Sequence, residues 1–335
     1  MRSRKNSGKP PRHAYLPRMT QDVTIAAVRE AAGHRATLRF EGARAGIVID
    51  ATGLSGRERD TLEDAVRAAA ARSWSGEVRI VVTAERVARR LIAVASGKGG
   101  VGKSTLAANL AIALKARGRR VGLVDADIYG PSQPRLMAAE DQRPTAKDKV
   151  LDPVPTPYGV PMLSMGQLIE PGKAIAWRGP MAAGALTQLV DADWGATDTL
   201  VLDLPPGTGD VQLTMIQKHK PAGAIIVSTP QDLALIDATR AIDLFDKAGI
   251  PVIGLVENMA GYVCPHCGEL SDPFGNGGAQ ATAERLGLPF LGRVPLAIGI
   301  RTASDAGQPP AAGNGADATA FHAIAGQVDA WLTEH

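Results

Sequence analysis

Residues 91–105, LIAVASGKGGVGKST, decide the fold of this chain. The apolar run Leu91–Ala95 shows no polar alternation, which is typical of a strand buried on both faces. A glycine-rich turn follows it, and we expect a helix over Thr105–Ala116. The spacing within Gly97–Ser104 matches Gly-x-x-x-x-Gly-Lys-Ser, and strand, loop and helix are the context that a phosphate-binding loop requires. The sequence therefore predicts a nucleotide site here.

The chemistry expected of this loop follows from its residue types. Glycines let successive backbone N–H groups point at phosphate oxygens, and the helix N-terminus adds a partial positive charge. We expect Lys103 to neutralise the β- and γ-phosphates of ATP, Ser104 to ligate Mg²⁺ and Thr105 to reach the α-phosphate. The predicted nucleotide-binding residues of the loop are Gly97, Lys98, Gly99, Gly100, Val101, Gly102, Lys103, Ser104 and Thr105.

Further short apolar runs follow the loop and are rich in β-branched residues. Segments of helical pattern separate them, so we expect each run to be a buried strand joined to the next by a helix. The fold class predicted is α/β, a doubly wound and mostly parallel sheet of the P-loop NTPase kind. The expected strands are Val121–Val124, Thr199–Leu202, Ala224–Val227 and Val252–Val256, with Phe290–Val294 as a further candidate.

Two of the helices are expected from apolar stripes at helical spacing. One lies behind an expected cap at Asp232, the other covers Phe321–Leu332, and we expect both stripes to pack into the core. Residues 144–161 and 307–315 are rich in Pro and Gly and are expected to be surface loops. The stripe behind Asp232 consists of Leu235, Ile236, Thr239, Ile242 and Phe245.

Composition divides the chain into three expected parts. Residues 1–18 hold six Lys/Arg and no acid, and we expect a basic disordered tail. Residues 19–86 follow the order helix, strand, strand, helix, strand, and are expected to form a small α+β accessory domain. Residues 90–335 form the expected P-loop ATPase domain, which includes a CxxC metal loop.

Charge and hydropathy argue against some classes of partner. The formal net charge is +3, and without the six basic residues of the tail the remainder is −3, so the body offers no general basic field for nucleic acid. No apolar run approaches the roughly 18 residues that a membrane span needs, and the basic N-terminus lacks the apolar core of a secretory signal. We therefore expect a cytoplasmic protein that binds neither membrane nor nucleic acid.

Aspartates follow two of the expected strands. Asp125 and Asp127 come after Val121–Val124, and Asp203 ends the strand that begins at Thr199. The carboxyl ends of parallel strands lie beside a P-loop, so these side chains are expected at the nucleotide. We expect Asp127 to orient the attacking water, and Asp203 to hold Mg²⁺ through its water shell.

Two cysteines, Cys264 and Cys267, stand two residues apart in an expected loop. Two thiolates at this spacing, with Gly268 behind them, form half of a metal knuckle. Redox chemistry is the weaker interpretation, because the irregular chain around them does not open a helix as a thioredoxin-like pair would. For His266, which lies between the two cysteines, the roles of metal ligand and of bystander are equally open. A symmetric dimer would complete a four-thiolate site, which suits either zinc or an iron–sulfur cluster.

Together these segments resemble the Mrp/ApbC family, P-loop ATPases that carry iron–sulfur clusters and are related to the partitioning ATPases and the nitrogenase iron protein. Lys98, a second lysine in the loop, has the placement seen in deviant P-loop ATPases, where it reaches across a dimer to the partner's nucleotide. The resemblance spans most of residues 90–295. The matching segments are Gly97–Thr105, Asp125–Ser132, Trp177–Met181, Asp203–Thr214 and Glu257–Met259 running into Cys264–Gly268.

The resemblance implies a homodimer that bridges one [4Fe-4S] cluster through Cys264 and Cys267 of both chains. It also implies that Asn258 contacts adenine, and it gives no firm role to Arg178. The segment 19–86 looks like a degenerate form of the family's small N-terminal domain, and because it has no cysteine, an independent metal role for it is doubtful.

The function predicted is that of an ATP-hydrolysing iron–sulfur cluster carrier. As a homodimer with ATP and Mg²⁺, it would receive a labile [4Fe-4S] cluster from donor proteins and transfer it to apoproteins. Its catalytic residues would be Lys98, Lys103 and Asp127. Two alternatives stay open: a ParA/MinD-like positioning ATPase, and a nucleotide switch in which zinc clamps the shared thiolates.

Overall fold

The computed structural model describes residues 18–85, 88–128, 130–147, 149–168 and 179–335. The chain divides into two compact units, residues 1–86 and 87–335. The expected disordered tail lies, apart from Arg18, outside the described residues, and so do Trp177 and Arg178. Within the described part, no helix combines the length and the apolar character needed to cross a membrane.

The first unit packs two helices on a three-stranded sheet of order β1-β2-β3. β1 and β2 are antiparallel, whereas β2 and β3 are parallel, so α2 is the crossover between them. Ser55 and Glu58 form a capping box that fixes the start of α2. The predicted order of helix, strand, strand, helix, strand is confirmed. The elements are α1 (Arg18–Ala32), the 3₁₀ turn η1 (Gly33–Arg35), β1 (Ala36–Glu41), β2 (Arg44–Asp50), α2 (Gly56–Ser73) and β3 (Glu77–Thr83).

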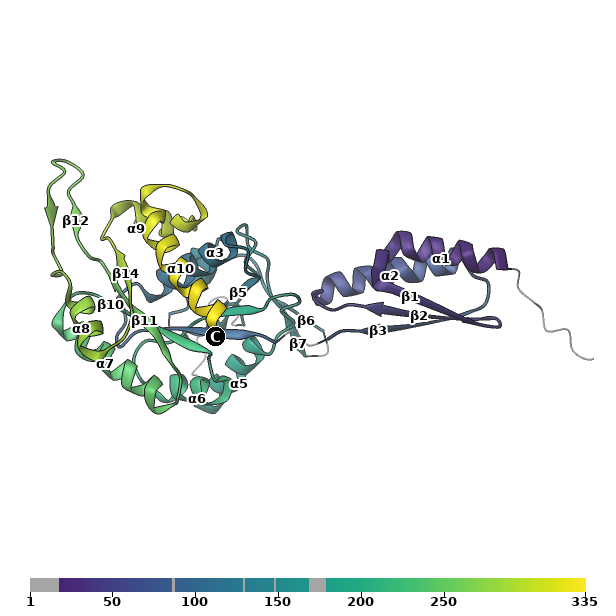
Figure 1. Cartoon of the computed structure of the whole chain (residues 1–335), viewed down its shortest axis with the longest axis horizontal. Helices are drawn as coiled ribbons and strands as arrows, with labels where there is room; N and C mark the ends of the chain where they lie inside the picture. The colour runs from purple at the N-terminus through teal and green to yellow at the C-terminus, as the bar shows by residue number, and fades with distance from the viewer. Residues whose placement is uncertain (1–17, 86–87, 129, 148, 169–178) are drawn as a thin grey trace, which may run out of the picture. The chain divides into compact units, whose positions relative to one another are not determined.

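The second unit is built on a seven-stranded sheet of order β14-β11-β10-β4-β9-β5-β8, in which every neighbouring pair is parallel (Figure 1). The strand that leads into the phosphate loop therefore lies at the centre of the sheet. The fold class predicted from the sequence is confirmed. The strands are β4 (Arg90–Ala95), β5 (Val121–Asp125), β8 (Met162–Ser164), β9 (Thr199–Asp203), β10 (Gly223–Ser228), β11 (Val252–Asn258) and β14 (Phe290–Val294).

Helices cover both faces of this sheet. Successive side chains of β4 point to opposite faces and are apolar, so each face needs helices to bury it. Ile92 and Val94 join one core cluster with α3, α9 and α10, whereas Ala93 and Ala95 join the other with α5, α6, α7 and α8. The helices are α3 (Lys103–Ala116), α4 (Gln133–Leu136), α5 (Gly179–Val190), α6 (Asp210–His219), α7 (Asp232–Lys247), α8 (Gly278–Leu286), α9 (Ile298–Asp305) and α10 (Ala316–Glu334), with the 3₁₀ turns η2 (Met165–Leu168) and η3 (Pro310–Ala312).

Some local predictions were wrong. The cap of α7 is Gln231, and Asp232 is already the first helical residue. Ile236 is 53% exposed, because the buried face of α7 runs through Leu235, Ala238, Ile242 and Phe245 and leaves its neighbour outside. The segment 144–161 is not only loop, since it contains a hairpin of β6 (Thr145–Lys147) and β7 (Val150–Asp152).

Candidate functional site

The phosphate loop joins the carboxyl end of β4 to the first turn of α3. Gly100 and Gly102 have φ angles of +79° and +83°, which only glycine adopts readily. A Cβ at Gly102 would also lie 2.0 Å from Nδ2 of Asn258, and a Cβ at Gly97 would lie 2.1 Å from the backbone of Asp237 on α7. The loop is therefore a glycine-dependent cradle whose backbone wraps around a space at the helix N-terminus.

Lys103 and Asp203 form a buried ion pair below this cradle. The Lys103 side chain is 6% exposed, and its ammonium donates to Oδ1 of Asp203, which is fully buried at the end of β9. It also donates to Oγ of Ser104 at 3.3 Å. The loop lysine, the hydroxyl and the carboxylate that the sequence assigned to phosphate and Mg²⁺ thus lie within one another's reach. Hydroxyl and carboxylate oxygens are the hard ligands that Mg²⁺ prefers, so these residues fit that ion.

A second buried carboxylate, Asp125, stands opposite Asp203 in the register of β5 and β9. Burial, with the Asp203 charge as the next cause, raises its pKa from 3.8 to about 7. Its oxygens accept hydrogen bonds from the backbone N–H groups of Asp127 and Gln133, both at 3.1 Å, and from Oγ of Ser164 at 2.9 Å. Asp125 therefore holds the turn after β5 against the edge strand β8.

Gln133 and Ser164 belong to this network, although the sequence did not single them out. Nε2 of Gln133 donates to Oδ2 of Asp203 at 2.8 Å and to the carbonyl of Ser104 at 2.9 Å, and the residue is fully buried. Gln133 directly follows the segment Asp125–Ser132, and this position next to a recognised motif was the one indication in the sequence that it belongs to the site. Ser164 lies on a strand of three residues, and no sequence pattern marked it.

Lys98 and Asp127, the other two predicted catalytic residues, flank the cradle differently. Lys98 is half-buried, and its ammonium makes no hydrogen bond or ion pair with a described residue. Its carbonyl accepts from Oγ of Ser96 at 2.9 Å, which fixes the backbone at that point. Asp127 is 8% exposed and its Oδ1 accepts from the N–H of Gly130 at 3.1 Å. The Lys98 ammonium can thus contact a ligand or a second chain, whereas the Asp127 carboxylate is held by a backbone hydrogen bond.

Asn258 lies at the end of β11, beside the loop. Its Nδ2 donates to the carbonyl of Val101 at 2.8 Å. A cavity of about 400 Å³ opens there, within the size range of small-molecule sites. The buried hydroxyl of Ser304 lines it and has no hydrogen-bond partner among the described residues, so a ligand could supply one. The wall combines the loop with apolar and polar side chains that include Ser104, Thr105, Asn258, Met259, Leu296, Ile300 and Ser304.

The two cysteines lie at the end of a hairpin that extends from the sheet of the second unit (Figure 1). The hairpin consists of β12 (Tyr262–Val263) and β13 (Leu270–Ser271). Backbone N–H groups of Cys267 and His266, and then the Cys267 thiol, lower the pKa of the Cys264 thiol. The turn closes with the N–H of Gly268 donating to the carbonyl of Cys264 at 2.8 Å. The turn therefore makes the Cys264 thiolate easier to form than in an open chain.

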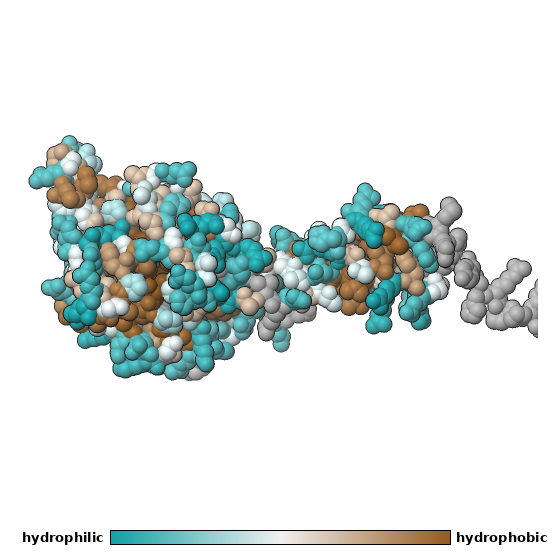
Figure 2. All heavy atoms as spheres, in the orientation of Figure 1, coloured by the Kyte–Doolittle hydropathy of each residue, from teal (hydrophilic) through white to brown (hydrophobic). Residues whose placement is uncertain are grey.

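The knuckle offers two sulfur ligands on an exposed surface. Cys264 is partly exposed and Cys267 is exposed. The apolar side chains beside them, Val263 and Leu270, are 60% and 64% exposed, and Figure 2 shows apolar atoms gathered on this hairpin. In the described residues, no group of three or more His, Cys, Asp or Glu side chains is placed to hold a metal ion. Among the described residues, no further metal ligand lies beside the two thiols, and no hydrogen bond links them to the phosphate loop.

Comparisons with known proteins agree on this unit. Residues 87–329 match the model of the family described as ParA, NUBPL iron-transfer P-loop NTPase. An iron–sulfur cluster carrier protein of Haemophilus influenzae is 49% identical over 223 residues, which are 66% of this chain and 60% of that protein. The chain thus spans less than two thirds of that relative's length.

Two further similarities cover more of the other chain. The iron–sulfur protein required for NADH dehydrogenase of Arabidopsis thaliana mitochondria is 51% identical over 65% of this chain and 70% of its own length. A solved structure of a nucleotide-binding protein from Archaeoglobus fulgidus, in complex with ADP, is 38% identical with a TM-score of 0.60, covering 69% of this chain and 90% of that one.

Proposed function

The chain belongs to the NUBPL iron-transfer P-loop NTPase family, and from this premise we propose that it is an ATP-hydrolysing carrier of a labile [4Fe-4S] cluster, held between two copies and transferred to apoproteins. The observation that carries the proposal is the exposed knuckle of Cys264 and Cys267, which has two sulfur ligands in the same unit as the phosphate loop. Two such knuckles on the two-fold axis of a homodimer supply four thiolates.

The nucleotide half of the proposal follows from the buried ion pair. ATP phosphates in the glycine cradle give the Lys103 ammonium a stronger partner than one carboxylate, so it moves from Asp203 to the β- and γ-phosphates. Asp203 and Ser104 are then free to hold Mg²⁺, which would neutralise charge on the phosphate oxygens. Asp127 orients the attacking water, and Asn258 contacts adenine in the adjoining cavity.

Lys98 acts on the partner's nucleotide in this proposal, which is supported by its lack of a partner among the described residues. Mixing two inactive variants tests this role. Lys98→Ala and Lys103→Ala should each abolish hydrolysis as homodimers, whereas a mixed dimer has one site with both lysines and should recover part of the activity. A mixed dimer that forms but stays inactive would show that Lys98 does not act across the interface.

Anaerobic reconstitution with iron and sulfide tests the cluster. The wild-type chain should develop a charge-transfer absorption band in the visible range, with about four irons per dimer. Cys264→Ser and Cys267→Ser should both abolish the band, whereas His266→Ala, in the same turn, should keep it if the histidine is a bystander. A colourless wild-type protein, or one that is purified under oxygen protection with zinc and no iron, would overturn the cluster assignment and favour the zinc clamp.

A further inference from the structure

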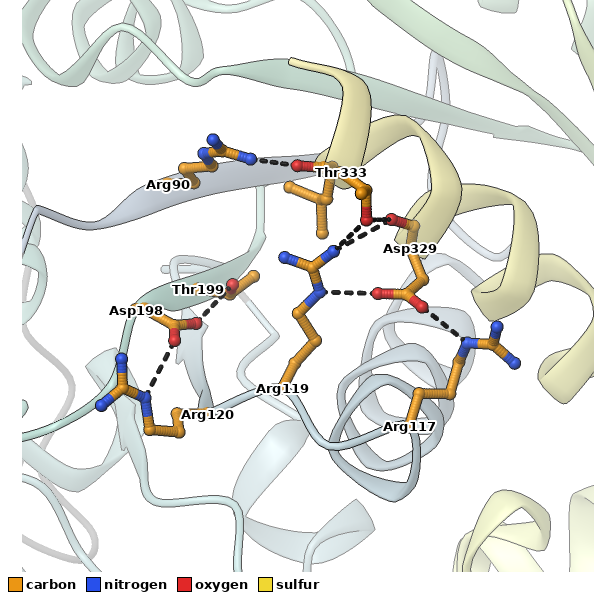
Figure 3. A network of polar contacts seen from close by, with 9 residues as sticks. Arg90, Arg117, Arg119, Arg120, Asp198, Thr199, Asp329 and Thr333 are labelled. Carbon is orange, nitrogen blue, oxygen red and sulfur yellow. Dashed lines mark hydrogen bonds and ion pairs between the residues drawn. The ribbon is translucent and has the colours of Figure 1, made fainter.

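Arginines gather at the amino ends of the strands, the edge of the sheet opposite the phosphate loop (Figure 3). Arg90 is the first residue of β4, and Arg117, Arg119 and Arg120 lie between the end of α3 and the start of β5. The polar network around them includes two aspartates, Asp198 before β9 and Asp329 on α10. Four arginines and two aspartates leave this network with a net charge of +2.

The two aspartates do not neutralise the arginines evenly. Asp329 accepts from Nε of both Arg117 and Arg119, at 3.0 and 2.6 Å, and these two guanidinium groups lower its pKa. Asp198 accepts from Arg120 at 2.9 Å. Arg90 has no carboxylate partner among the described residues, and its guanidinium group donates a hydrogen bond to the backbone carbonyl of Leu332. Its positive charge is therefore uncompensated.

A cavity of about 420 Å³ lies in the middle of this network, and Arg90 and Arg119 both line it. Its volume falls in the range of small-molecule sites. Hydroxyl groups of Thr199 and Thr333 and the Asp198 carboxylate complete the polar part of the wall. Figure 3 shows the Arg119 guanidinium on the side of the network where Arg90 and Thr333 lie. Two like charges that face one cavity repel each other unless an anion lies between them.

We propose that this cavity is a second binding site, which takes a small phosphorylated compound with its phosphate between Arg90 and Arg119. Arginine is a usual phosphate ligand because its planar guanidinium group can offer two parallel N–H donors. Arg90 offers Nε and Nη2 in this way, since its Nη1 donates to Leu332. Arg119 offers Nη1 as a single donor, since its Nε and Nη2 are bonded to Asp329 and Thr333. The Asp198 carboxylate and the Thr333 hydroxyl accept hydrogen bonds from hydroxyl groups on the rest of the molecule. The same carboxylate repels the continuous phosphate backbone of a nucleic acid, so the site favours a compact ligand.

The site is independent of the ATPase proposal, because it shares no residue with the phosphate loop or its adjoining cavity. Inorganic phosphate is the probe that tests it, with the full-length protein saturated with Mg-ADP so that the phosphate loop is occupied. The arginine Nε–H resonances report binding by NMR at constant ionic strength. Those of Arg90 and Arg119 should shift saturably as phosphate is added.

Arg90→Gln and Arg285→Gln form a matched pair, since each removes one positive charge from an exposed arginine of the second unit and only Arg90 lines the cavity. Arg90→Gln should weaken phosphate binding by at least about tenfold, as expected for one lost charge-assisted contact. Arg285→Gln should change it by less than about twofold, and Arg90→Lys, which keeps the charge, should fall between them. Saturation that is absent up to tens of millimolar phosphate, or equal weakening by both glutamine variants, would overturn the site.

Discussion

Replacing Asp125 with asparagine should stabilise the nucleotide-free protein, and the gain should grow with pH. Asp125 is fully buried, and burial together with the Asp203 charge raises its pKa from 3.8 to about 7. The unfolded chain releases this proton near its ordinary pKa, whereas the folded chain holds it until about pH 7. Wild-type stability therefore falls as pH rises between the two pKa values and is constant above the higher one.

The magnitude follows from the interval between these pKa values. Each pH unit inside it changes the free energy of unfolding by about 1.36 kcal/mol, so wild type loses roughly 3 kcal/mol between about pH 5 and pH 7. Asparagine does not ionise and escapes this loss. The asparagine side chain has one accepting oxygen, whereas the two oxygens of Asp125 accept from Asp127, Gln133 and Ser164. Losing part of this hydrogen bonding should destabilise the variant by about 1–2 kcal/mol at every pH. We expect near equality at about pH 5 and a gain of roughly 2–3 kcal/mol at about pH 8.

Urea unfolding followed by circular dichroism, in EDTA and without nucleotide, measures this difference across the pH range. Asp141→Asn is the control, because Asp141 is an exposed aspartate in the same unit. Its difference from wild type should stay close to zero throughout. A difference for Asp125→Asn that does not change with pH would refute the assignment of a buried, proton-holding carboxylate at this position.

Three further substitutions or modifications have defined outcomes. Gly102→Ala should destabilise the protein by about 1–3 kcal/mol in urea and weaken ADP binding by calorimetry, because its φ is +83° and a Cβ would meet Asn258; unchanged ADP affinity would contradict the cradle. Lys103→Ala should lower phosphate release from ATP by at least about 100-fold and, by leaving a buried carboxylate unpaired, lower stability by about 3 kcal/mol; normal turnover would refute its role. In the metal-free protein, iodoacetamide should alkylate Cys264 faster than Cys267 near neutral pH, as measured by mass spectrometry. The reason is that backbone N–H groups lower the pKa of Cys264, and we expect this to outweigh the greater exposure of Cys267. Equal rates would count against the knuckle geometry.

The sequence was sufficient for the sheet because its strands are buried on both faces. Runs such as Leu91–Ala95 and Thr199–Leu202 need no partner information to be recognised, and the loop between a strand and a helix has a fixed spacing. The edge strand β8 escaped prediction because it has only three residues, too few for any period. Ile236 was wrongly predicted to be buried. Helical spacing shows which side of a helix faces the core, but how many residues on that side are covered depends on what packs against it.

The polar network could not be predicted for a different reason. Gln133 contacts Asp203, 70 positions away, and Ser164 contacts Asp125, 39 positions away, so their roles depend on strand order. A glutamine or serine without its partner resembles any surface residue. Aspartates at strand ends were predictable because the carboxyl edge of a parallel sheet collects them, whereas the residues that orient them were not.

The phosphate loop and the cysteine hairpin are connected through one strand, β11, and this connection limits how independently they can move. Asn258, its last residue, donates to the phosphate loop, and only Met259, Ala260 and Gly261 separate it from the cysteine hairpin. This short link is itself fixed, since the Ala260 N–H donates to the carbonyl of Val294 at 3.0 Å and the Gly261 carbonyl accepts from Leu296 at 2.9 Å. In the proposed carrier, a displacement of Asn258 would have five residues, Met259–Val263, in which to be absorbed before it reaches the Cys264 thiol. A link this short and this well bonded transmits a shift more readily than a long, free loop would.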